Sequence, residues 1–381
     1  MQSTNSLPKV IFRNLRWKLA QTWLSFFPET EIIGVAGSVG KTTTKEIIAS
    51  ILGEKFRTIK TTGNFDPIFN LPLTAFKIRK NTKLVAELSV DKTGQMDKYL
   101  TLIKPRIGVV TKLSIEHADN EHFGSPQDAI REEQKLIKSL PDFGWSVTSG
   151  DDKLTVESAT LSKAKVVLCG FNEGNDLQII NFLQKIISNQ AKSYFEIKCD
   201  NKNYQVETNL LGKHNALVVC YGIAVGIISG MDFAEIQRGI SKIFPVEHRL
   251  QPKKSRWGVV IDDTYNAIPA AVEGAIDVLV NIDKKNPTLV LGEMKELGEY
   301  SKDQHFLIGK YAKGKGIKRL AVIGDHAKEV VRGFRGSKTN CLLAKSNDEI
   351  IQWLNETKPS IVLIKGSRSM QMEKVVEAIC A

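Results

Sequence analysis

The stretch Gly34-Val35-Ala36-Gly37-Ser38-Val39-Gly40-Lys41-Thr42-Thr43-Thr44 decides the fold. The apolar run at 32–36 predicts a buried parallel strand. Residues 42–52 follow with isoleucine and leucine at helical spacing, so a glycine turn joins a strand to a helix. Strand, glycine turn, Gly-Lys-Thr and helix are together the parts of a phosphate-binding loop.

This loop predicts a nucleotide site. Glycines let the backbone approach a ligand closely, so that its N–H groups and the helix N-terminus hold phosphate oxygens. We expect Lys41 to reach the outer phosphates and the Thr42 hydroxyl to bind Mg2+. Val35 stands where the common motif has glycine, and the alternative is an ordinary tight turn. The predicted phosphate contacts are Gly37, Ser38, Gly40, Lys41, Thr42 and Thr43.

Length and composition indicate a water-soluble chain of two or three domains. It has 381 residues, of which 42% are hydrophobic and 25% are charged. The net charge of +11 comes from scattered basic residues, so we expect no nucleic-acid partner. The five cysteines show no paired spacing, which favours reduced thiols in the cytoplasm. The sequence has neither a membrane-spanning stretch nor a signal peptide.

Residues 1–30 predict a short helical leader with interspersed basic residues. One interpretation is a helix packed on the main domain, and the other is a basic amphipathic helix on a membrane surface. The residues expected on one apolar face are Val10, Ile11, Leu15, Leu19, Trp23 and Leu24.

The rest of the chain predicts an α/β fold, with a P-loop doubly wound central domain at 31–245 and a smaller Rossmann-like C-terminal domain at 246–381. Strands are expected at 84–88, 107–111, 145–148 and 165–169, with a hairpin at 194–209. Helices are expected at 126–140 and 215–229. In the C-terminal domain we expect strands at 258–262, 288–291, 320–323 and 361–364, and helices at 269–280, 348–355 and 372–379.

Two polar residues follow predicted strands and are candidate metal ligands. Glu87 ends an apolar strand, where a carboxylate beside a P-loop can bind Mg2+. Its alternative is a helix cap or a surface charge. His117 follows another strand end, and either a structural role or a metal or substrate contact fits it. The next helix carries Arg131, Glu132, Glu133 and Lys135, which by themselves predict a solvated face.

A set of ordered motifs resembles the Mur ligase family, and within it the ligases that add D-alanyl-D-alanine in peptidoglycan synthesis. The resemblance covers the chain from about Glu31 to its end. The motifs are 34–44, Thr62-Gly63-Asn64, Leu71-Pro72-Leu73-Thr74, Glu87, His117, Gly212-Lys213-His214-Asn215, His248-Arg249-Leu250, 262–267, 292–299 and Lys365-Gly366-Ser367-Arg368.

The resemblance implies an ATP-dependent ligase that forms an amide bond through an acyl phosphate, with Mg2+ as cofactor. Lys41 would then neutralise phosphate charge, and Thr42 and Glu87 would hold one Mg2+. His117 would help to hold a second Mg2+. Asn215, Arg249 and Asp263 would lie in the nucleotide site. The implied substrate contacts are Asn64, Tyr265, Asn266, Lys365 and Arg368.

Departures from the family pattern lead to further expectations. Many relatives carry a carbamylated lysine as a Mg2+ ligand where this chain has Glu133, so we expect Glu133 to replace it as a ligand and catalytic group. Val218 stands where relatives have a second asparagine of the nucleotide site. The leader is too short for the family's N-terminal domain, which binds uridine diphosphate.

The expected partners are therefore a muropeptide-type carboxylate and an amino-acid or dipeptide amine, and we expect a monomer. One alternative is a Mur-type ligase for a lipid-linked, cofactor or poly-amino-acid carboxylate. Another is a non-catalytic nucleotide-binding partner protein, against which the presence of Lys41, Thr42, Glu87 and His117 argues.

Overall fold

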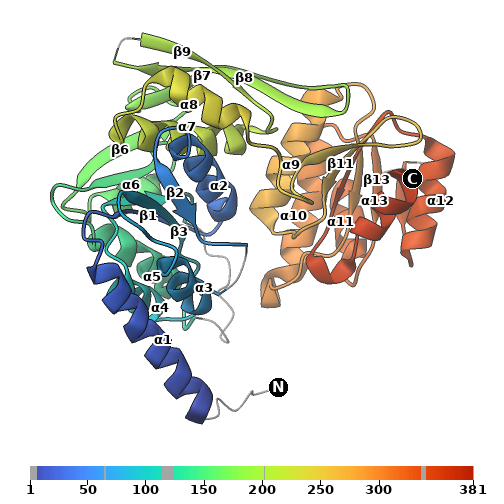
Figure 1. Cartoon of the computed structure of the whole chain (residues 1–381). Coiled ribbons are helices and arrows are strands. Elements are labelled where there is room, and N and C mark those ends of the chain that lie inside the picture. The colour runs from blue at the N-terminus through green and yellow to red at the C-terminus, as the bar shows by residue number, and fades with distance from the viewer. Residues whose placement is uncertain (1–6, 64–65, 114–122, 201, 336–339, 381) are drawn as a thin grey trace. The chain divides into compact units, whose positions relative to one another are not determined.

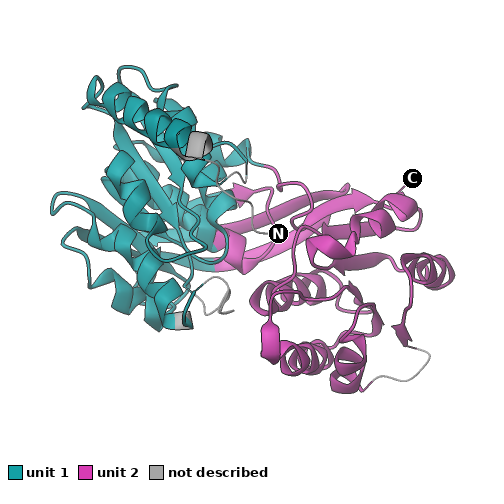
Figure 2. Ribbon diagram, turned by 90° about the horizontal axis from the view of Figure 1, so that it is seen from below, with its two compact units in different colours: residues 1–180, 196–206, 217–243 teal, residues 181–195, 207–216, 244–381 magenta. Residues whose placement is uncertain are grey.

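The computed structural model describes residues 7–63, 66–113, 123–200, 202–335 and 340–380. The chain divides into two compact units that interleave along the sequence (Figure 2). Unit 1 comprises residues 1–180, 196–206 and 217–243, and unit 2 comprises residues 181–195, 207–216 and 244–381. The domain boundary predicted after residue 245 stays a prediction.

The larger sheet has nine strands in the order β2-β3-β1-β4-β5-β6-β7-β8-β9 (Figure 1). Each neighbouring pair from β2 to β7 in this order is parallel. The strands are β1 (Glu31–Ala36), β2 (Arg57–Lys60), β3 (Thr82–Glu87), β4 (Ile107–Val110), β5 (Trp145–Ser149), β6 (Lys165–Gly170), β7 (Leu177–Ile187), β8 (Gln190–Cys199) and β9 (Lys202–Thr208).

The strand order reverses beside β1. From β1 the chain passes to β2 on one side of the sheet, whereas from neighbouring β3 it crosses to β4 on the other. In doubly wound sheets ligands bind at such a switch point, beyond the carboxyl ends of the strands. Val35 near the end of β1 pairs with Glu87 at the end of β3, so the P-loop and Glu87 lie at this point.

Helices cover the parallel part of the sheet. The α2 helix buries Ile47, Ile48, Ile51 and Leu52. At Gly239 of α8 an added Cβ would lie 2.4 Å from the Ile51 Cα, so only glycine permits this close packing. The helices are α1 (Leu7–Ser25), α2 (Lys41–Leu52), α3 (Pro67–Ala75), α4 (Gln95–Leu102), α5 (Pro126–Lys138), α6 (Lys153–Ala159), α7 (Lys213–Ile228) and α8 (Phe233–Ser241).

The leader forms helix α1, which packs on unit 1, but its buried face differs from the prediction. Trp17 and Ala20 are buried, whereas Ile11, Leu15 and Leu19 are more than half exposed. At 100° per residue, positions 11, 15 and 19 form one stripe and positions 17 and 20 lie roughly opposite. The predicted single apolar face is therefore wrong, since Leu15 and Leu19 face away from the unit that α1 covers.

Unit 2 contains a six-stranded sheet in the order β10-β11-β15-β12-β13-β14. The β10 strand is antiparallel to β11 and the other neighbours are parallel. The strands are β10 (Gln251–Lys254), β11 (Val259–Asp263), β12 (Thr288–Leu291), β13 (Arg319–Val322), β14 (Cys341–Leu343) and β15 (Ile361–Lys365). The helices are α9 (Pro269–Ile282), η1 (Gly298–Tyr300), α10 (Ser301–Gly314), α11 (Ala327–Phe334), α12 (Asn347–Thr357), η2 (Arg368–Met370) and α13 (Glu373–Cys380).

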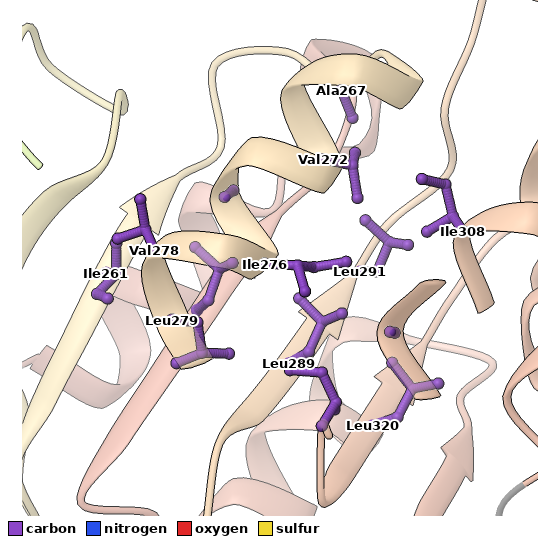
Figure 3. Packing of buried hydrophobic residues seen from close by; sticks show 14 of the residues in the cluster. Ile261, Ala267, Val272, Ile276, Val278, Leu279, Leu289, Leu291, Ile308 and Leu320 are labelled. Atoms are coloured by element: carbon purple, nitrogen blue, oxygen red, sulfur yellow. The ribbon is translucent and has the colours of Figure 1, made fainter. Parts of the chain in front are cut away.

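The two faces of this sheet bury separate clusters. Leu289 and Leu291 of β12 pack with Ile276 of α9 in one cluster (Figure 3), and Val290 between them belongs to the other. This alternation is the period-2 pattern of a strand covered on both faces. The predicted α/β class is thereby confirmed. Among the described residues, no helix is long and apolar enough to cross a membrane.

Candidate active site

The loop between β1 and α2 needs glycine at two points. Gly37 has φ of 124° and Gly40 has φ of 86°, values that residues with a Cβ rarely adopt. A Cβ at Gly37 would lie 2.3 Å from Thr111 Oγ1. The Ser38 N–H donates to the Lys112 carbonyl at 2.7 Å, which fixes the loop against the end of β4. The loop thus places glycine backbone, which has no side chain to block a ligand, close to the α2 N-terminus, as a phosphate-binding loop requires.

Lys41 lies across this loop. Its Nζ donates to the Gly37 carbonyl at 2.5 Å and to the Ser38 carbonyl at 3.3 Å. These bonds hold the ammonium beside the loop backbone, where phosphate oxygens would bind. A lysine here can neutralise charge that develops on a transferring phosphoryl group.

Thr42 and Glu87 meet at the switch point. The Thr42 Oγ1 donates to Glu87 Oε1 at 2.9 Å, and Glu87 is 9% exposed. The other carboxylate oxygen of Glu87 lies 3.3 Å from Nζ of Lys45, a side chain with no exposed surface. The hydroxyl in the first turn of α2 and the carboxylate at the end of β3 are oxygen donors that fit Mg2+. Glu87 is therefore buried at the site, and the surface-charge alternative is wrong.

Helix α5 contributes Glu133 to the same site. Glu133 is 8% exposed and lines a small pocket of about 40 Å³ with Ser38 and Lys41, a volume sufficient for an ion or a few waters. Its neighbour Glu132 is 1% exposed and accepts from Met96 N at 2.8 Å and from Lys135 Nζ at 2.7 Å. The solvated-face prediction is thus wrong for both glutamates, because this part of α5 is packed against α4 and the P-loop.

Within unit 2, the residues predicted for nucleotide and substrate lie around the end of β11. Lys365 is 3% exposed and donates from Nζ to Asp263 Oδ2 at 2.6 Å and to the Asn266 carbonyl at 2.7 Å. The Arg249 guanidinium carbon lies 4.2 Å from the Tyr265 ring centroid, a cation–π contact. Unit 2 thus places an ion pair, Lys365 with Asp263, and a cation–π pair, Arg249 with Tyr265, near the end of β11.

Two models of known families match the chain. The Mur ligase middle domain matches residues 35–226, which is half of the chain, and the Mur ligase, glutamate ligase domain matches residues 248–368. The chain belongs to the Mur ligase family.

Named relatives agree with this membership. The UDP-N-acetylmuramoyl-tripeptide--D-alanyl-D-alanine ligase of Bacillus subtilis is 29% identical over 91% of this chain and 75% of its own length. The ligase of the same name from Escherichia coli is 27% identical over 98% of this chain and 82% of its own length. The crystal structure of MurF ligase from Thermotoga maritima in complex with ADP has a TM-score of 0.83 and 24% identity, over 96% of this chain and 83% of that one.

Some of the remaining Mur ligase positions are described by the structure and others are not. His117 and Asn64 lie outside the described residues. Asn215, in the first turn of α7, donates from Nδ2 to the Leu211 carbonyl at 2.7 Å. Arg368 lies at η2, where its Nη1 is 3.2 Å from Glu373 Oε1. Val218 is beside the P-loop, since a Cβ at Gly40 would lie 3.5 Å from Val218 Cγ2.

Lys45 is a site residue of this Mur ligase that the sequence analysis missed. The signal was present, because a lysine in the apolar stripe of α2 needs a buried partner. Lys45 Nζ lies 3.4 Å from Glu46 Oε1 as well as 3.3 Å from Glu87 Oε2. The Lys45 ammonium therefore compensates the negative charge of Glu87 from the buried side of the carboxylate.

A second group of polar residues lies together in unit 2 and consists of Glu293, from the family's 292–299 motif, His305 of α10 and His326 before α11. His326 Nδ1 lies 2.6 Å from Glu293 Oε1. His305 Nδ1 donates to the Ser301 carbonyl at 2.7 Å, and its Nε2 accepts from Met294 N at 3.1 Å. Burial lowers the pKa of His305. Since both His305 nitrogens are bonded within the chain, the group fits a structural network that fixes this loop better than a metal site.

Proposed function

We propose that the chain is an ATP-dependent cytoplasmic ligase that joins a muropeptide-type carboxylate to the amine of D-alanyl-D-alanine or of another amino acid or dipeptide. The observation that carries the proposal is the group Lys41, Thr42 and Glu87 at the switch point of a Mur ligase sheet. The printed names of the relatives from Bacillus subtilis and Escherichia coli support D-alanyl-D-alanine as the amine.

In the proposed reaction, an oxygen of the acceptor carboxylate attacks the γ-phosphorus of ATP, and the bond from that phosphorus to ADP breaks. The amine nitrogen then attacks the carbonyl carbon of the acyl phosphate. The carbon–oxygen bond breaks, inorganic phosphate leaves, and the amine gives up a proton. Protein groups contribute by positioning and by neutralising charge.

The P-loop backbone at Gly37, Ser38 and Gly40 and the α2 N-terminus with Thr43 would hold the phosphates, while Lys41 would neutralise charge on the outer ones. Thr42 and Glu87 would hold Mg2+, which would supply positive charge to the nucleotide phosphates when bound. The paired hydroxyl and carboxylate at 2.9 Å support this fit. Lys45 would hold the Glu87 carboxylate in place from the buried side.

Glu133 would take the place of the carbamylated lysine that many relatives use. Its burial beside Lys41 and Ser38 supports this role. A glutamate carries the same negative charge on a shorter arm, and it needs no CO2. In this role Glu133 would bind a second Mg2+, and His117 would be another ligand of that ion.

In unit 2, Asn215, Arg249 and Asp263 would contact the nucleotide. Tyr265, Asn266, Lys365 and Arg368 would contact the amine substrate, with Lys365 also fixing Asp263 through its 2.6 Å bond. Asn64 would contact the acceptor.

The test is phosphate release from ATP, screened across carboxylate and amine pairs with the full chain. The proposal expects release only when both partners are present, with the fastest turnover for the muropeptide and D-alanyl-D-alanine. If turnover occurs only with a lipid-linked, cofactor or poly-amino-acid carboxylate, the assignment of the acceptor changes and the assignment as a ligase stands. Tight ATP binding without turnover for any pair would favour a non-catalytic partner protein.

A further inference from the structure

Helices α1 and α3 expose a group of large apolar side chains on unit 1. These side chains are between 49% and 67% exposed. Single exposed leucines are common, but a group on two adjacent helices marks an interaction surface. We call it the α1–α3 patch; its members are Ile11, Phe12, Leu15 and Leu19 of α1 and Phe69 and Leu73 of α3.

The patch does not arise from a loosely attached helix, because the opposite face of α1 is fixed to unit 1. Trp17 is buried, and its Nε1 donates to Thr101 Oγ1 at 3.0 Å. Gln21 Nε2 donates to the Thr101 carbonyl at 2.8 Å. Trp23 Nε1 donates to the Ile78 carbonyl at 3.4 Å. With these bonds made, Leu15 and Leu19 must face outward.

The patch is continuous across the two helices. Figure 1 shows α1 beside α3, and the Arg16 guanidinium carbon lies 5.1 Å from the Phe69 ring centroid. Phe69 and Leu73 are four residues apart and therefore share one face of α3. Arg16 thus joins the apolar stripe of α1 to the exposed face of α3.

The charges around the patch are mostly positive. Helix α1 carries Arg13, Arg16 and Lys18 and no acidic residue, and Asp66, which caps the N-terminus of α3, is the acidic exception. The α3 sequence contains no charged residue, and the segment that follows it carries Lys77, Arg79 and Lys80. Phenylalanine, leucine and isoleucine flanked by lysine and arginine are the composition of helices that lie in the interface of an anionic membrane.

We propose that the α1–α3 patch docks unit 1 on an anionic phospholipid surface, with the apolar side chains at the acyl boundary and the cations among the headgroups. A second copy of the chain fits the patch less well, because each copy would bring the same cationic rim to the contact. This inference does not depend on the proposed ligase activity.

The test is co-sedimentation of the full chain with vesicles of phosphatidylcholine plus phosphatidylglycerol, and with vesicles of phosphatidylcholine alone. We expect binding to the anionic vesicles that weakens at high salt. Leu15→Asp and Leu19→Asp should each lower the partition coefficient about tenfold. Lys18→Gln should lower it about fivefold on anionic vesicles only. Phe143→Asp and Leu183→Asp, at similarly exposed positions elsewhere, are the matched controls and should bind as wild type.

Three results would overturn the inference. One is no sedimentation with anionic vesicles at low salt, and another is equal binding by the wild type and both leucine variants. The third is a wild-type dimer in light scattering that Leu15→Asp converts to monomer, which would assign the patch to a second copy. A thermal unfolding curve of each variant checks that the variant is folded. If a leucine variant fails to fold, Lys18→Gln still tests the inference independently.

Discussion

The Thr42 hydroxyl donates to Glu87 Oε1 at 2.9 Å and so joins the first turn of α2 to the last residue of β3. The two residues are 45 positions apart in sequence and meet only because β1 and β3 are parallel neighbours. Lys45 completes the group from the interior of the unit, at 3.3 Å from the other oxygen of Glu87. This relationship supports the proposed Mg2+ site and leads to the following predictions.

Replacement of Lys41 by alanine should remove catalysis without removing the fold. The Lys41 ammonium acts on charge that develops during phosphoryl transfer, so we expect phosphate release to fall by about a hundredfold or more. Its side chain fills no core position, so the thermal unfolding midpoint should stay close to that of the wild type. Lys153→Ala, at a lysine whose side chain is 90% exposed, is the control. Near-normal turnover by a folded Lys41→Ala protein would remove the P-loop assignment.

Glu133 and Glu132 should respond differently to the same substitution. Glu133→Gln should raise the Mg2+ concentration needed for half-maximal turnover, because it removes one negative charge from the proposed second metal site. Glu132→Gln should instead lower the thermal unfolding midpoint, because Glu132 accepts from Met96 N and Lys135. Activity of the wild type should not depend on added bicarbonate. Equal and small effects of both variants on Mg2+ dependence would argue against Glu133 as a ligand.

Lys45 should be coupled energetically to Glu87. Lys45→Met leaves the buried Glu87 carboxylate without its cation, so we expect a loss of about 3–5 kcal/mol in the free energy of unfolding. Glu87→Gln in the same background should restore about 1–3 kcal/mol, measured as the coupling in a double-mutant cycle by urea unfolding. Strictly additive effects would show that the two charges do not stabilise each other.

His305 should make stability pH-dependent. Burial holds the pKa of His305 below its ordinary value of 6.5, so the unfolded chain binds a proton where the folded chain does not. The contribution is therefore complete above about pH 6.5 and is lost as the pH falls through the folded pKa. Urea unfolding between about pH 7 and about pH 5 should show this loss, and His305→Gln should flatten it. An unchanged slope in the variant would assign the pH dependence to other groups.

Much of the fold could be predicted from the sequence, because its parallel strands are short apolar runs and its Gly-Lys-Thr loop stands between a clear strand and a clear helix. Helix α10 was missed, since its buried face consists of His305, Ile308, Gly309 and Ala312, a set with little hydrophobic periodicity. The outward turn of Leu15 and Leu19 could not be predicted either, because α1 carries apolar residues around most of its circumference.

The candidate site was predicted less completely than the fold. Single motifs identified Lys41, Thr42 and Glu87, whereas the burial of Glu132 and Glu133 depends on contacts of α5 with α4 and the P-loop, which no local pattern reveals. Lys45, in helix α2, was missed because its partner Glu87 lies in strand β3, 42 positions along the chain.

The most direct test of the proposed ligase follows oxygen from the acceptor into phosphate. The full chain is supplied with ATP, Mg2+, D-alanyl-D-alanine and a muropeptide whose terminal carboxylate carries labelled oxygen. Mass spectrometry then measures labelled phosphate and new amide together. The account predicts one labelled oxygen in inorganic phosphate for each amide bond formed, because the carboxylate becomes the acyl phosphate. Amide formation with unlabelled phosphate, or phosphate release without amide, would contradict it.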